Sequence, residues 1–287
     1  MGTGGLDVRG GIPAINPFGP RKWSTSGPCR REGKSLREKA DVVEFAVILV
    51  FAGMQSIFGI GILFFGTPTL LILGHSFVET LSIVLPASMA VSLLQILHGT
   101  LPARAWQVRF GGWCLLPLLV ALTLSLVFGM EFELELLVAI MLSAYVLIRT
   151  SRRLHGYVQE GARRSPRLWL AIIGLIHGIS NLGGGLLAIF VSNTFADKKV
   201  IRSHIAFCYL CFATIQFSVL CVVTPGVIHL GQLGYAALAA VVFWILERRV
   251  FAQIPTPVFD RAFTALIGGY SALVFAKLAG ILEIPAA

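Results

Sequence analysis

Long apolar runs without charges alternate with short polar stretches over most of this chain. The runs cover about 43–73, 78–99, 111–130, 132–150, 168–195, 204–224, 230–247 and 261–282. Most contain the roughly 20 residues that a helix needs to cross about 30 Å of hydrocarbon. Membrane-barrel strands would alternate in polarity, so helices are the expected spanning elements. The pattern predicts an all-α, polytopic membrane helix bundle with about eight hydrophobic segments.

Two of the runs are too long for a simple crossing. Phe45–Leu73 contains 29 residues and Leu168–Phe195 contains 28, and neither carries a formal charge. A straight helix of that length measures about 43 Å and would need a tilt beyond the usual range. Each run has a glycine cluster at its middle, Gly59-Ile60-Gly61 or Gly183-Gly184-Gly185. Because glycine costs about 1 kcal/mol in a helix interior, we expect a broken helix or a helical hairpin at each cluster.

The two long runs also resemble each other. A shift of 124 residues places Gly59 on Gly183 and Gly61 on Gly185. This indicates an internal duplication, and matching interrupted helices point to a transporter's binding site. The predicted organisation is a flexible basic cytoplasmic tail (1–42), transmembrane repeat one (43–150), a basic cytoplasmic link (151–167) and transmembrane repeat two (168–287).

Composition and charge agree with a membrane location. The chain is 56% apolar and 13% charged, which excludes an ordinary soluble enzyme. The net charge of +9 lies in the tail and in short loops, as on a cytoplasmic membrane face, and nucleic-acid binding is not expected. We expect a multi-pass protein of the cell (inner) membrane. The positive-inside rule predicts that both the tail and the link lie on the cytoplasmic side. Whether the two long runs span or re-enter, and where the C-terminus lies, stay open.

Enzyme chemistry finds little support in the sequence. Cys208 and Cys211 have metal or redox spacing but no second pair, which favours apolar packing. The six histidines are scattered and no P-loop is present. We expect no cofactor and no metal, with the lipid bilayer and a small anion as partners. A homo-oligomer is left open as a further partner. An integral membrane enzyme and a non-transporting membrane assembly subunit are the alternative functions.

The stretch Gly174–Leu187, GLIHGISNLGGGLL, resembles the glycine-rich signature of the TauE/SafE sulfite exporter (TSUP) family. Gly53–Gly61, followed by Pro68, resembles a reduced copy of it. The resemblance covers roughly 43–282, with Ile60 and Ser192 as departures from the family pattern. It implies a secondary permease for a small anion, such as sulfite or an organosulfur anion.

A broken helix exposes unpaired N–H groups at the start of its second half, where the helix dipole attracts an anion. Neutral donors suit an oxyanion that must be released again. His177 is the only titratable group in the second long run. Its three candidate roles are to bind the anion, to relay a proton or only to pack against its neighbours. Close helix packing is the alternative role for the glycines. The candidate substrate-binding residues are Gln55, Ser56, Gly59, Gly61, Thr67, Pro68, His177, Ser180, Asn181, Gly183, Gly184, Gly185, Ser192 and Asn193.

Overall fold

The computed structural model describes residues 29–128, 134–247, 249, 253 and 256–278. Every regular element among these residues is helical, which confirms the all-α prediction. The chain divides into two compact units, Met1–Glu38 and Lys39–Ala287, and the following description concerns the second. Most of the predicted tail lies outside the described residues.

The helices follow the predicted apolar runs, with additional short elements between them. The first half contains α1 (Cys29–Phe58), a π-helical turn η1 (Ile62–Gly66), α2 (Thr67–Ile72), α3 (Phe77–Leu97), α4 (Arg104–Phe110), a second π-helical turn η2 (Gly111–Leu115), α5 (Leu116–Val127) and α6 (Leu134–Thr150). The second half contains α7 (Arg152–Arg164), α8 (Pro166–Ser180), α9 (Gly184–Thr194), α10 (Lys198–Val223), α11 (Gln232–Leu246) and α12 (Thr256–Leu278).

Four helical stretches among the described residues are long and apolar enough to cross a membrane. They are Asp41–Phe58, Phe77–Leu97, Arg104–Val127 and Lys198–Val223. The starts of α3 and α10 are fixed by local capping. Ser76 and Glu79 form a capping box before α3, and the Asp197 carboxylate accepts two backbone N–H bonds at the start of α10.

Both predicted helix breaks are present. One helix ends at Phe58 and the next begins at Ile62, and likewise α8 ends at Ser180 and α9 begins at Gly184. The residue after each first half is left-handed, with φ of +80° at Gly59. The equivalent residue at the second break, Asn181, has φ of +61°. Glycine and asparagine are the residues that most readily adopt this conformation, so each break is encoded locally.

The chain doubles back after each break. Beyond the first, the His75 imidazole lies 3.8 Å from the Glu44 carboxylate, near the point where the first long run begins. Beyond the second, Asn193 near the end of α9 lines the same pocket as Pro166 at the start of α8. Both long runs are therefore helical hairpins, which is one of the two forms predicted for them.

The two hairpins match at an offset of 122 residues. α1 and α8 end at Phe58 and Ser180, and α2 and α9 end at Ile72 and Thr194. The left-handed residues Gly59 and Asn181 have the same spacing. The predicted offset of 124 is therefore wrong at the breaks, because it aligned Gly59 with Gly183.

Close backbone contacts follow the same offset. A methyl group at Gly61 would overlap the Phe51 carbonyl oxygen and lie 2.5 Å from the Gln55 nitrogen. A methyl group at Gly183 would lie 2.5 Å from the carbonyl oxygen of Ile173 and 2.9 Å from the nitrogen of His177. In each hairpin, glycine lets the returning chain touch the backbone of the first helix.

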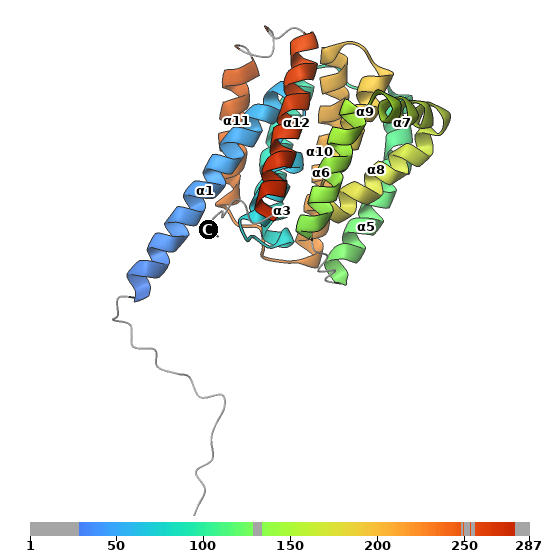
Figure 1. Cartoon of the computed structure of the whole chain (residues 1–287). Helices are drawn as coiled ribbons and strands as arrows, with labels where there is room; N and C mark the ends of the chain where they lie inside the picture. The colour runs from blue at the N-terminus through green and yellow to red at the C-terminus, as the bar shows by residue number, and fades with distance from the viewer. Residues whose placement is uncertain (1–28, 129–133, 248, 250–252, 254–255, 279–287) are drawn as a thin grey trace, which may run out of the picture. The chain divides into compact units, whose positions relative to one another are not determined.

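The bundle has two chemically different ends, which α3 connects. Near the start of α3, Ser82 accepts a hydrogen bond of 2.7 Å from Gln232, and beyond its end Thr100 donates to Ser203. We call the first the acidic end, because it carries Glu44 and Glu79. The second is the basic end, where α7 lies beside α9 (Figure 1). It carries a clear excess of cations, although Glu160, Asp197 and Glu247 also lie there. The cations are Arg104, Arg109, Arg152, Arg153, Arg163, Arg164, Arg167, Lys198 and Lys199.

The central packing joins the two halves. α3 packs against α10 and α11, α8 packs against α5, and α12 packs against α6. Gly178 allows α8 to approach α5 closely, because a methyl group there would lie 2.6 Å from the Leu118 carbonyl oxygen. The second break meets the returning half of the first hairpin inside this packing, where the Asn181 amide donates to the Thr67 hydroxyl at 2.7 Å.

Candidate functional site

The first break is closed by a buried glutamine. Gln55 Nε2 donates to the Ser88 carbonyl and hydroxyl oxygens at 3.2 and 3.1 Å and to the Ser92 hydroxyl at 3.0 Å. Its Oε1 accepts the backbone N–H of Ile62 at 3.1 Å. That N–H opens the second half of the hairpin, where an anion was predicted to bind. Gln55 therefore occupies the predicted anion position with a neutral amide oxygen.

The carbonyl groups at the first break are also satisfied by side chains. Gln95 Nε2 donates to the Gln55 carbonyl oxygen at 2.7 Å, and Arg202 Nη1 donates to the Ser56 carbonyl oxygen at 3.2 Å. The Arg202 guanidinium in turn binds both carboxylate oxygens of Glu247, at 2.5 and 2.7 Å. The Ser56 hydroxyl donates to a carbonyl one turn earlier in its own helix. This network pins the first break in place.

His177 stands at the equivalent position of the second break, 122 residues after Gln55. It is fully buried, and neither ring nitrogen has a hydrogen-bond partner among the described residues. Its ring stacks on Phe212 with centroids 4.1 Å apart, and the Tyr209 ring centroid lies 6.1 Å away. Gln216 faces the imidazole from α10 and interacts with it, although no hydrogen bond of good geometry joins the two side chains or satisfies either polar atom of the Gln216 amide.

Two further unpartnered groups lie beside the start of α9. A methyl group at Gly184 would overlap the Tyr209 hydroxyl, which is buried and forms no hydrogen bond to a described residue. The Asn181 amide nitrogen is bonded to Thr67, but its oxygen is buried and unpartnered. No side chain caps the first turn of α9. The Gly185 N–H is bonded to the Leu182 carbonyl oxygen at 3.3 Å, and Gly184 adjoins the Tyr209 hydroxyl, so the positive end of the α9 dipole lies beside these buried polar atoms.

We call His177, Asn181, Tyr209, Gln216 and the first turn of α9 the second-break cluster. Six side-chain nitrogen and oxygen atoms of these residues are buried without partners in the described part of the chain. Each such atom costs about 1–3 kcal/mol unless something binds it. Buried polar groups in native proteins are almost always hydrogen-bonded, so the cluster is the strongest candidate binding site.

The glycine triplet serves this site less directly than predicted. Gly183 packs on the backbone of α8, and a methyl group at Gly185 would lie 2.8 Å from the rings of Phe64 and Tyr145. The Tyr145 hydroxyl also donates to the Leu182 carbonyl oxygen at 2.7 Å. Packing is therefore the role of Gly183 and Gly185 here, and only Gly184 adjoins the unpartnered groups.

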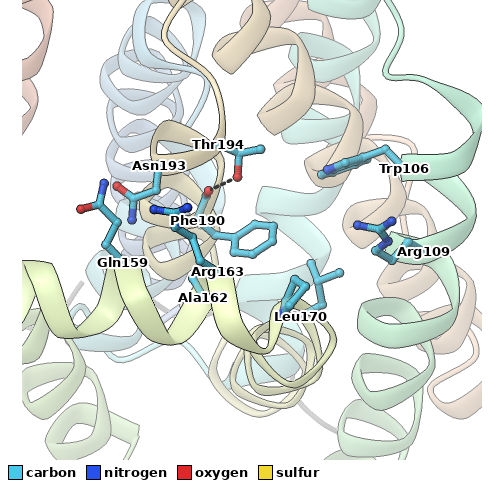
Figure 2. Close-up of a pocket in the computed structure, with 10 residues that line it drawn as sticks. Trp106, Arg109, Gln159, Ala162, Arg163, Leu170, Phe190, Asn193 and Thr194 are labelled. Carbon is cyan, nitrogen blue, oxygen red and sulfur yellow. Dashed lines mark hydrogen bonds between the residues drawn. The ribbon is translucent and has the colours of Figure 1, made fainter.

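The other predicted residues divide into three groups. Thr67 joins the second-break cluster through Asn181, with Pro68 following it in the first turn of α2. The Ser180 hydroxyl donates to a carbonyl within its own helix. Ser192 is exposed and Asn193 lies nine residues beyond Gly184, about 14 Å along α9, so neither is brought to the break. Asn193 instead lines a separate pocket at the basic end (Figure 2).

Tyr209 and Gln216 were missed by the sequence-based prediction. They are seven residues apart on α10, so they share one helix face. Gln216 is the only amide in the run 204–224, and this was the available signal. Within the described ranges, no group of three or more His, Cys, Asp or Glu residues is placed to hold a metal ion. Cys114 and Cys208 are buried free thiols.

No family model matches the chain, and neither a curated protein nor a solved structure matches it. The resemblance to the TSUP family therefore stays a prediction from the glycine-rich stretches.

Proposed function

We propose that this protein is a secondary membrane transporter of a small anion, which binds at the second-break cluster. Three of the buried, unpartnered groups beside the uncapped start of α9 carry this proposal, because they can donate to an anion: the Tyr209 hydroxyl, the Gln216 amide nitrogen and one imidazole nitrogen of His177. The other three atoms, among them Asn181 Oδ1, are acceptors. Tyrosine, glutamine and imidazole N–H or O–H groups are neutral donors, and the helix dipole adds partial positive charge. This chemistry holds an oxyanion without a fixed buried cation, so release stays feasible.

The proposed membrane arrangement has two re-entrant hairpins and six crossings. α3, α4 to α5, α6, α10, α11 and α12 cross, while the hairpins enter from opposite ends and meet between Thr67 and Asn181. This corresponds to an inverted duplication, now with an offset of 122 residues. By the positive-inside rule, the basic end faces the cytoplasm.

This arrangement revises one prediction about sidedness. Glu44, just after the predicted tail, lies at the acidic end, whereas α7 of the predicted link lies at the basic end. With α3 crossing the membrane between them, these two segments lie on opposite sides. The tail and the link are therefore not both cytoplasmic in the proposed arrangement.

The substrate class comes from the sequence resemblance, which suggests sulfite or an organosulfur anion. Such an anion is small enough for donors gathered around a single helix start. The cluster residues His177, Asn181, Tyr209 and Gln216 are completely buried or nearly so, with Tyr209 against Gly184. Substrate entry therefore requires α10 to move away from the hairpin, as in alternating access.

Uptake into proteoliposomes tests the proposal. Purified chain is reconstituted, and entry of labelled sulfite, thiosulfate or a sulfonate is followed under proton and sodium gradients. We expect His177→Phe and Gln216→Leu to reduce uptake at least about tenfold, because each removes donors from the site. His98→Phe is the matched control, since His98 is exposed. If the wild-type chain takes up no anion, the assembly-subunit alternative is supported. If both variants take up the anion as fast as the wild type, the second-break cluster is not the binding site.

A further inference from the structure

We propose that the pocket at the basic end binds a phosphate group, supplied by an anionic phospholipid or by free phosphate. The pocket has a volume of about 340 Å³ and lies between α4, α7, α8 and α9. Figure 2 shows Arg109 and Arg163 on opposite sides of it, with Asn193 and Gln159 beside Arg163. It is distinct from the second-break cluster, because it lies at the other end of α9.

The polar side chains of the pocket are donors for an anion. No carboxylate lines it, and neither Arg109 nor Arg163 has an ion pair among the described residues. By contrast, the neighbouring Arg164 is 2.7 Å from Glu160, and Arg167 lies over the Trp113 ring. Guanidinium groups bind phosphate oxygens in a bidentate manner.

Asn193 provides an independent indication of a ligand. Its amide nitrogen is buried and has no hydrogen-bond partner in the described part of the chain, although the residue lies at the rim of a pocket. A phosphate oxygen would satisfy that N–H group, which otherwise costs free energy. The exposed Thr194 hydroxyl is already bonded within its helix, to the Phe190 carbonyl oxygen at 2.9 Å.

The remaining walls suit the lipid source best. Pro166, Leu170, Phe190 and Trp106 give the pocket an apolar side next to its two arginines. α7 is amphipathic: Ala162 is buried against the bundle, while Tyr157 is 75% exposed. A short basic helix of this kind lies in the headgroup region, and basic pockets between membrane helices bind lipid phosphates. This reasoning rests on the proposed membrane arrangement.

The test compares lipid retention by two double variants. Protein is purified from nanodiscs of neutral phosphatidylcholine or of phosphatidylcholine with phosphatidylglycerol, and bound lipid is counted by native mass spectrometry. We expect Arg109→Gln with Arg163→Gln to weaken phosphatidylglycerol retention about tenfold or more. Arg104→Gln with Arg164→Gln removes the same charge from α4 and α7 but not from the pocket, and should retain lipid as the wild type does.

Inorganic phosphate distinguishes the two sources. If phosphatidylglycerol stays bound in millimolar phosphate, the ligand is the lipid. If phosphate displaces the lipid and by itself raises the unfolding temperature, the ligand is the free anion. Equal phosphatidylglycerol retention and equal phosphate stabilisation in both double variants and the wild type would overturn the proposal. All four arginines are exposed, so folding is checked by gel filtration, and Asn193→Leu provides a second, charge-neutral variant. Binding is measured without transport, so failure of the proposed function leaves this result interpretable.

Discussion

The two helix breaks share a backbone design but differ in their polar chemistry. In both, a left-handed residue ends the first helix and a glycine two positions later touches that helix's backbone. At the first break, Gln55 satisfies both the returning helix and α3. At the second, His177 occupies the same position but forms no hydrogen bond of good geometry within the described residues, and only Gln216 faces its ring with a polar group. Glycines thus shape both hairpins. The side chain at one position, Gln55 or His177, makes the difference between a structural break and a candidate binding site.

The difference has an energetic meaning. A satisfied buried network rigidifies its surroundings, whereas unpartnered buried groups destabilise the fold until a ligand binds them. The first break, fixed further by Arg202 and Glu247, is suited to remain still. The second is suited to bind and release. An unsatisfied buried polar group in a native protein calls for an explanation, and a binding or catalytic role is one of them.

The largest effect is expected from the glycines that both breaks share. Gly61→Ala and Gly183→Ala each force a methyl group against backbone atoms that cannot move independently. We expect each to lower the free energy of unfolding by about 3 kcal/mol or more. Thermal unfolding in detergent, followed by circular dichroism, measures this. Gly112→Ala is the control, since no atom lies within 4 Å of its methyl position. If only one of these two variants loses stability, the two glycines do not play the same structural role in their hairpins.

An intermediate effect should separate the two breaks. Gln55→Leu leaves the Ile62 N–H group and two serines without partners, which should cost about 2–4 kcal/mol of stability. His177→Phe removes two unpartnered nitrogens and keeps the ring stacked on Phe212, so stability should change by less than about 1 kcal/mol or rise. The same unfolding measurement applies. Equal losses for both variants would show that His177 is a structural residue like Gln55.

The smallest effect is expected from exchanging the left-handed residues. Gly59→Asn keeps a residue that accepts positive φ, but its Cβ would lie 3.2 Å from Arg202 Cγ, so we expect a loss of about 1 kcal/mol. Asn181→Gly keeps the backbone but loses the bond to Thr67, at about 0.5–1.5 kcal/mol. Alanine at either position should cost about 1 kcal/mol more than these exchanges. Alanine variants as stable as the exchanges would show that the left-handed conformation is not what ends the helices.

Much of this architecture was predictable because its signals are local. Overlong uncharged runs and central glycines located both breaks, and the Asn181-to-Gly185 region was correctly placed at a helix break. The register was not predictable from glycines alone. Asn181 replaces the first glycine, so matching glycine to glycine shifted the alignment by two residues.

Side-chain contacts between distant segments explain the remaining differences. Nothing near Tyr209 or Gln216 in the sequence signals that α10 covers His177, because that contact depends on tertiary packing. Similarly, Gln55 and His177 both appear as buried polar residues before a glycine cluster. The difference comes from Ser88 and Ser92, which lie more than 30 residues from Gln55 in the sequence and accept the hydrogen bonds of its amide. Local patterns thus define elements, whereas function depends on which partners the fold provides.

The meeting of the two hairpins between Thr67 and Asn181 has an electrical consequence. In the proposed arrangement, Thr67 and Asn181 are both fully buried, so an anion bound beside them lies inside the membrane, away from both solutions. An anion that reaches this position has crossed only part of the membrane potential. A charge crossing the full potential exchanges about 2.3 kcal/mol per 100 mV. Each part of the anion's path, before and after His177, would collect part of that work, making transport sensitive to voltage.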